Sequence, residues 1–219
     1  GTLRFSFEAD NDIYTSPSFL ESDQGLMIFF GTDNGTLYAL NMNGELYDGY
    51  PKGISEGYDF GPIVGSIIFE DLDSDGLSEI VFGSETGKMN VLKSFNNSYS
   101  ELVFYNSFPS SNTFGYASSS IISDIDQDND LEIISGTTGD IMVYDVKESS
   151  SSSSNWNMYR GDNHRTGFYD YSMQCFPGDI NFDSTVNILD IVTLVNVVVN
   201  SSNLSGDESC AADLNSDGI

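Results

Sequence analysis

A short acidic loop between two apolar runs constrains the fold of this chain more than any other stretch. The loop covers residues 71–79, with acids at alternate positions and a glycine, Gly76, that lets the backbone turn sharply. Apolar runs of strand length lie on both sides, at residues 65–69 and 79–83. The pattern therefore predicts two short β-strands joined by an acidic loop.

The chemistry of this loop favours a bound calcium ion. Several carboxylates around one point repel each other, and a cation relieves that repulsion. Calcium accepts six to eight oxygen ligands in a flexible geometry, whereas magnesium requires a tight octahedron. A solvated acidic turn is the alternative interpretation. The expected calcium ligands are the side chains of Asp71, Asp73, Asp75 and Glu79 and the carbonyl of Leu77.

The pattern of apolar runs and glycines repeats at a spacing of 52 or 53 residues. Glycines that follow the central apolar run stand at Gly31, Gly83 and Gly136, and the acidic loops begin at Asp71 and Asp124. A period of this size built from short strands indicates propeller blades, because helical repeats would show amphipathic helices. The expected ligands of the second loop are Asp124, Asp126, Asp128, Asp130 and Glu132.

The three units differ in their acidic loops. In the first unit, the hairpin signal of residues 25–40 has only the shorter stretch 21–25 before it, without alternating aspartates, so we expect no ion there. In the third unit, Asn129 stands where Gly76 stands in the second. Asparagine tolerates the left-handed conformation, so we expect a weakened site rather than a lost one.

The loop, the strand after it and the glycine turn together resemble the FG-GAP or VCBS type of repeat found in integrin-like and bacterial secreted β-propellers. The resemblance covers roughly residues 16–146. It implies that each loop joins two strands of a blade and binds calcium through the positions given above. About three blades are too few to close a propeller of four to eight, so we expect a partial propeller over residues 1–147 and a fragment of a longer protein.

Residues 148–155 are rich in serine, which predicts a flexible linker that buries nothing. A segment with Trp156, Met158, Thr166 and Gly167 follows, and it is similar to a stretch near the ends of secreted bacterial propellers. We expect residues 156–174 to pack on the propeller or the linker. The tripeptide at 160–162, Arg-Gly-Asp, matches an integrin-type adhesion motif but recurs by chance. His164, the only histidine, has no catalytic partner beside it in sequence.

The C-terminal stretch, residues 175–219, carries acidic loops of a second kind. An acid stands at the twelfth position of the loop that begins at Asp179, and the apolar run 188–199 follows, which is the loop-then-helix half of an EF-hand. Asn187 and Asp190 suit the N-cap and third position of that helix. Valine-rich composition alone would favour a strand, but the loop decides for a helix. A partial second loop begins at Asp213.

Two such half EF-hands in tandem resemble a dockerin type I module. The resemblance implies calcium ligands in both loops and a cohesin-like or cell-surface protein partner. Ser184 replaces the usual glycine, and Ile188 and Leu189 replace a polar pair, so calcium binding carries over better than partner recognition. The implied ligands are Asp179, Asn181, Asp183, Thr185 through its carbonyl, Asn187 through water, and Asp190, and in the partial loop Asp213, Asn215 and Asp217.

The two cysteines flank the C-terminal loops in similar positions. Cys175 and Cys210 precede the two loops by four and three residues, so near-symmetric repeats would bring them together. A disulfide would close a long loop and contribute about 3 to 4 kcal/mol. Two unpaired thiols are the alternative, because connectivity cannot be read from sequence. Calcium loops and a cystine both suit an oxidising, extracellular location.

Charge and hydropathy exclude other classes. A net charge of −27, from 34 acids and only seven lysines and arginines, argues against binding nucleic acid or an anionic membrane. No apolar run of about 18 residues is present, so we expect no membrane span. The chain begins without methionine or a signal-peptide pattern, which fits a fragment.

The fold class expected is therefore mainly β, a partial propeller followed by a small α-helical dockerin-like module. The expected function is that of a secreted, calcium-binding, non-catalytic scaffold with a docking tail, and the propeller would bind a carbohydrate or a protein. One alternative is an accessory part of a secreted polysaccharide-degrading or proteolytic enzyme with its catalytic domain upstream. The other is an adhesin that uses residues 160–162.

Overall fold

The computed structural model of the chain describes residues 1–22, 25–150, 156–161, 165, 178 and 188–199. Two compact units divide at residues 169 and 170, and each is treated by itself. The first is built from β-strands, and the described part of the second holds one helix. Among the described residues, no helix has the length and hydropathy needed to cross a membrane.

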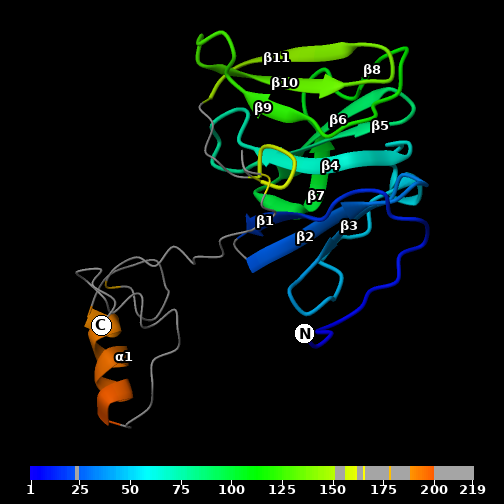
Figure 1. Ribbon diagram of the computed structural model, residues 1–219. Helices are drawn as coiled ribbons and strands as arrows, with labels where there is room; N and C mark the ends of the chain where they lie inside the picture. Colours follow the sequence, from blue (N-terminus) through cyan, green and yellow to red (C-terminus); the bar gives the residue numbers. More distant parts are fainter. Residues whose placement is uncertain (23–24, 151–155, 162–164, 166–177, 179–187, 200–219) are drawn as a thin grey trace. The chain divides into compact units, whose positions relative to one another are not determined.

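The first unit contains three antiparallel sheets that stack one over another (Figure 1). The first sheet consists of β1 (Ser18–Ser22), β2 (Gly25–Gly31) and β3 (Leu37–Leu40). The second consists of β4 (Ile63–Glu70), β5 (Glu79–Ser84), β6 (Lys88–Phe95) and β7 (Ser98–Phe104), with the short β8 (Ser110–Ser111) paired to β6. The third consists of β9 (Ile121–Ser123), β10 (Asp130–Gly136) and β11 (Ile141–Ser149). A short 3-10 helix, Ile54–Glu56, lies between β3 and β4.

Each sheet is a meander of neighbouring strands, as the sequence pattern predicts. Alternating and β-branched residues fill the strands, and glycine turns connect them. Gly87 has φ +82° and lies between β5 and β6, where a side chain would meet the Asn112 carbonyl at 2.3 Å. This close approach explains why the turn of the second unit uses glycine.

Two apolar interfaces hold the stack together. The first interface lies between sheets one and two and contains Phe29, Phe69 and Phe82, all fully buried. The second lies between sheets two and three and contains Val81, Tyr116 and Ile133. The glycines of the period serve these interfaces: a Cβ on Gly31 would lie 2.6 Å from Ile63, and one on Gly83 would lie 2.6 Å from Tyr116. The recurring glycine therefore allows close contact between neighbouring sheets.

The N-terminal residues cover the outer face of the first sheet. Phe5, Phe7 and Ala9 alternate as partly buried positions and pack against Phe30 and Tyr38. The Phe7 ring lies edge-on to Tyr38, with 5.5 Å between ring centroids. In the third sheet, by contrast, Ile141 and Val143 are 74% and 49% exposed.

The expected mainly-β class is confirmed, and the three glycines of the period lie one in each sheet, in β2, β5 and β10. The sheets described do not close into a ring. Residues 188–199 form helix α1 (Ile188–Val199), so the acidic loop was the right guide and the strand preference of valine was overridden.

The linker expected at residues 148–155 is wrong in its first three residues. Glu148 and Ser149 belong to β11, with Ser149 paired to Asp130, and Ser150 is buried. Serine composition alone could not show this, because backbone pairing decides it. Residues 151–155 lie outside the described part.

The residues after the linker pack on the sheets. Trp156 is 4% exposed, lies in the first interface and meets the Phe19 ring edge-on at 5.3 Å. Its carbonyl accepts a hydrogen bond from the Phe69 N–H at 2.8 Å, and the Asn157 carbonyl accepts one from the Ile122 N–H at 3.0 Å. The segment therefore bonds to both the second and the third sheet.

Candidate metal sites in two acidic loops

The loop between β4 and β5 is closed by bonds from its own carboxylates. Asp71 accepts hydrogen bonds from the N–H groups of Asp75 and Gly76, at 3.2 and 2.9 Å. Glu79, at the start of β5, accepts one from the Leu72 N–H at 2.7 Å. Gly76 has φ +88°, which is the turn conformation that the sequence predicts. The result is a tight loop whose backbone is held by the Asp71 and Glu79 carboxylates.

The loop between β9 and β10 repeats this construction. Asp124 accepts bonds from the N–H groups of Gln127 and Asn129, at 2.6 and 3.4 Å, and Glu132 accepts one from the Ile125 N–H at 2.8 Å. Asn129 has φ +70°, so asparagine takes the left-handed conformation at the position of Gly76. The expectation that Asn129 can take the left-handed conformation in place of glycine is therefore confirmed.

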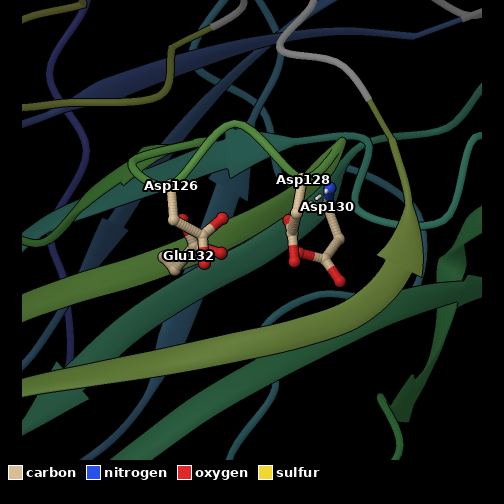
Figure 2. A group of neighbouring side chains, drawn as sticks. All are labelled: Asp126, Asp128, Asp130 and Glu132. Atoms are coloured by element: carbon tan, nitrogen blue, oxygen red, sulfur yellow. Dashed lines mark hydrogen bonds between the residues drawn. The ribbon is translucent and has the colours of Figure 1, made fainter.

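Each loop brings a group of carboxylates together. In the second loop, one oxygen from each of four acids lies within 4.8 Å of the others. Figure 2 shows that Asp126 lies beside Glu132 and that Asp128 lies beside Asp130. In the first loop, the corresponding group has three acids within the same distance. The two groups are Asp126, Asp128, Asp130 and Glu132, and Asp71, Asp73 and Glu79.

Three expected ligands stand apart from these groups. Asp75 accepts a bond from the Leu77 N–H at 2.9 Å and lies 3.3 Å from the Lys93 ammonium. Leu77 itself packs partly buried against the first interface. Asp124 holds the loop backbone instead, through the two N–H bonds described above. Asp75 and Asp124 bind loop N–H groups and Leu77 packs on the first interface, so these three residues stabilise the loop conformation. The grouped acids, by contrast, bring their oxygens close to one another.

Buried carboxylate oxygens without partners mark the convergent groups. Asp73 Oδ1, Asp130 Oδ1 and Glu132 Oε1 have no hydrogen-bond partner among the described residues, and Glu132 is only 3% exposed. A buried charged oxygen without a partner is costly unless a cation compensates it. Such oxygens are suited to a hard cation such as Ca²⁺.

The electrostatics of both loops reflect this crowding. Burial raises the pKa of Glu79 to about 8, and Asp73 and Asp75 add to the effect. Hydrogen bonding to the Asp128 carboxylate raises the pKa of Asp130 to about 6. Like charges at short distance disfavour ionisation of one another, and a divalent cation would reverse that effect.

Two lysines that the sequence analysis did not single out lie beside the loops. Lys93 in β6 contacts Asp73 at 2.7 Å, which raises the pKa of its ammonium. Lys147 in β11 lies 3.6 Å from both Asp128 and Asp130. No signal in the sequence pointed to these contacts, because each lysine reaches its loop from a different strand. One ammonium against three or four carboxylates still leaves a net negative group.

A pocket of about 460 Å³ adjoins the first loop and gives solvent access to it. Asp75, Gly76 and Leu77 line it on one side, and Glu21 and Tyr99 belong to the remaining lining. The lining includes Asp75 but none of the three grouped acids of this loop.

Of the expected ligands in the C-terminal stretch, the structure describes only one. Asp190 is 2% exposed and lies in the first turn of α1. Residues 179–187 and 213–217, with the other expected ligands, lie outside the described part, as do Cys175, Cys210, His164 and Asp162.

Comparison with known families settles the character of this stretch. Residues 177–219 match the dockerin type I domain. We refer to them as the dockerin segment. Dockerin type I domains bind Ca²⁺ and attach to cohesin partners, and they occur in secreted cellulosome components. The dockerin segment is thus a calcium-binding docking module. No curated protein matches the chain.

Proposed function

We propose that the β unit is a non-catalytic scaffold whose two acidic loops each bind one calcium ion, and that the dockerin segment attaches this scaffold to a cohesin-bearing partner outside the cell. In this proposal the three sheets are blades of the FG-GAP or VCBS type. Calcium binds in two of the three blades, at the loop that joins the first strand of the blade to the second.

One observation carries the calcium proposal. Asp126, Asp128, Asp130 and Glu132 converge within 4.8 Å, and two of their oxygens are buried without a partner (Figure 2). Lys147 does not satisfy them, because it lies 3.6 Å from its nearest oxygens in this group and its side chain is 68% exposed. Four carboxylates in one place match the oxygen preference of Ca²⁺.

Chelation tests the proposal on the whole chain. Trp156 is the only tryptophan and lies in the first interface, so its fluorescence reports unfolding of the β unit separately from the dockerin segment. EDTA should lower the melting temperature followed by this fluorescence, and added calcium should restore it, because an ion that binds only the folded state stabilises it.

Substitution locates the effect. Glu132→Gln should remove most of the calcium response of the second loop, whereas Glu101→Gln, a change of an exposed glutamate in β7, should leave the response intact. A fluorescence melt that is the same in EDTA and in calcium would contradict the proposal for the β unit.

The docking half of the proposal has its own readout. A cohesin pull-down should retain the chain in calcium and lose it in EDTA, and Asp179→Ala should weaken capture. Capture that is equally strong without calcium would contradict the proposed docking mode. Neither half assigns catalysis to the described residues, and assay of the chain on polysaccharides and proteins should show no turnover.

A further inference from the structure

The end of β11 connects the two acidic loops. Ser149 is the last residue of β11 and Ser150 follows it, 70 or more positions beyond the first loop in sequence. Each of the two serines nevertheless makes hydrogen bonds to both loops. We call these two residues the serine bridge.

Toward the first loop, the serine bridge makes two hydrogen bonds. The Ser74 hydroxyl donates to the Ser149 carbonyl at 2.9 Å, and the Ser150 hydroxyl donates to the Asp71 carbonyl. Ser74 lies within the loop, with φ +58°, and Asp71 is its first acid. The bonds therefore hold the loop at its entry and at its turn.

Toward the second loop, both bonds end on one carbonyl. The Ser150 N–H donates to the Asn129 carbonyl at 3.0 Å, and the Ser149 hydroxyl donates to it at 3.4 Å. Asn129 is one of two left-handed residues in this loop, the other being Gln127. Ser150 is buried, so its bonds compete little with water.

We infer that the serine bridge couples the two loops, so that calcium bound in one raises the affinity of the other. This inference rests on the proposed function. A bound ion fixes the backbone of its loop, and that backbone fixes the serine bridge. The second loop then binds with part of its ordering already done, which is the thermodynamic basis of positive cooperativity.

The expected size follows from one hydrogen bond. A buried hydrogen bond of net value about 1 kcal/mol corresponds to about a fivefold change in affinity. Inactivating one loop should therefore weaken calcium binding by the other about fivefold.

Calorimetric titration of the full chain tests this. All variants carry Asp179→Ala and Asp213→Ala, so that the dockerin segment contributes no heat. Glu132→Gln then leaves only the first loop, and Glu79→Gln leaves only the second. With the serine bridge intact, each remaining loop should bind calcium about fivefold more weakly than it does when both loops are functional.

Ser150→Ala isolates the coupling. It removes the hydroxyl that bonds to Asp71 but keeps the N–H that bonds to Asn129, and the bond from Ser74 to the Ser149 carbonyl remains. Each loop should therefore still bind calcium, with a weaker dependence on the other loop. Ser150→Thr keeps a hydroxyl and should restore the coupling, and Ser55→Ala, a change of an exposed serine, should not affect it.

The outcomes separate the inference from the proposed function. A smaller coupling in Ser150→Ala than in the natural chain, with calcium binding retained, supports the inference. Two ions that bind the unaltered loops independently overturn the inference and leave the proposed calcium sites standing. Absence of calcium binding in every variant with functional loops overturns both.

Discussion

Stability of the calcium-free β unit should depend on pH through Glu79. Its side chain is 1% exposed and receives a single described hydrogen bond, from the Leu72 N–H. Burial raises the pKa of this carboxyl from 4.5 to about 8. The folded protein therefore holds a proton that the unfolded chain releases at neutral pH.

The direction and size of the change in the free energy of unfolding with pH follow from proton linkage. Below about pH 4.5 the carboxyl is protonated in both states, and the group has no effect. Between about 4.5 and 8, only the folded state keeps the proton, so the free energy of unfolding falls as pH rises. A pKa difference of one unit between the folded and unfolded states corresponds to about 1.4 kcal/mol. The free energy of unfolding should therefore be lower by at most about 5 kcal/mol above pH 8.

Denaturant unfolding in EDTA, followed by Trp156 fluorescence at several pH values, measures this loss. Glu79→Gln cannot ionise, so its free energy of unfolding should lack this component, and the difference from the natural chain should change by up to about 1.4 kcal/mol per pH unit within the window. Glu101→Gln, at an exposed site, should follow the natural chain.

In EDTA above about pH 4.5, Glu79→Gln should avoid the loss of stability that the natural chain suffers. In saturating calcium, the natural chain should be the more stable of the two proteins. The ion requires an ionised carboxylate, so the natural chain should gain stability that Glu79→Gln cannot. If the two proteins show parallel pH profiles in EDTA, burial does not raise the pKa of Glu79, and the reasoning fails.

Three further predictions test other contacts. Lys93→Met removes the ammonium that competes for Asp73, so calorimetry should show tighter calcium binding by the first loop; unchanged affinity would mean that the ammonium does not compete. Trp156→Ala should lower the free energy of unfolding by about 3 to 5 kcal/mol in denaturant followed by circular dichroism, since a buried aromatic leaves a cavity; a loss below about 1 kcal/mol would contradict its packing. Gly83→Ala should cost about 1 to 3 kcal/mol in the same assay, because the new Cβ meets Tyr116 at 2.6 Å; a stable variant would show that the interface relaxes.

The turn conformations of the acidic loops could be predicted from sequence, because residues close together in the chain determine them. Residues within ten positions decide the turn at Gly76 and the left-handed conformation of Asn129, and both were expected from the sequence. The helix at residues 188–199 was likewise indicated by the loop before it, against the propensity of its valines.

Contacts between distant residues could not be predicted in this way. Ser150 and Asp71 are 79 positions apart, and no periodic pattern joins them. Lys93 reaches Asp73 from a different strand. The serine-rich composition after residue 147 pointed toward a linker, whereas pairing with Asp130 extends β11 through Ser149. Tertiary pairing overrides composition at such positions.

The covering of the first sheet by Phe5 and Phe7 has a practical consequence for handling the protein. These rings shield an apolar surface that would otherwise lie open to neighbouring molecules, so removal of residues 1–9 should make the purified β unit prone to self-association. At the third sheet, Ile141 and Val143 are exposed, and threonine at both positions should improve solubility while keeping strand propensity. The first sheet is thus covered on its outer face, whereas the third sheet leaves apolar side chains exposed.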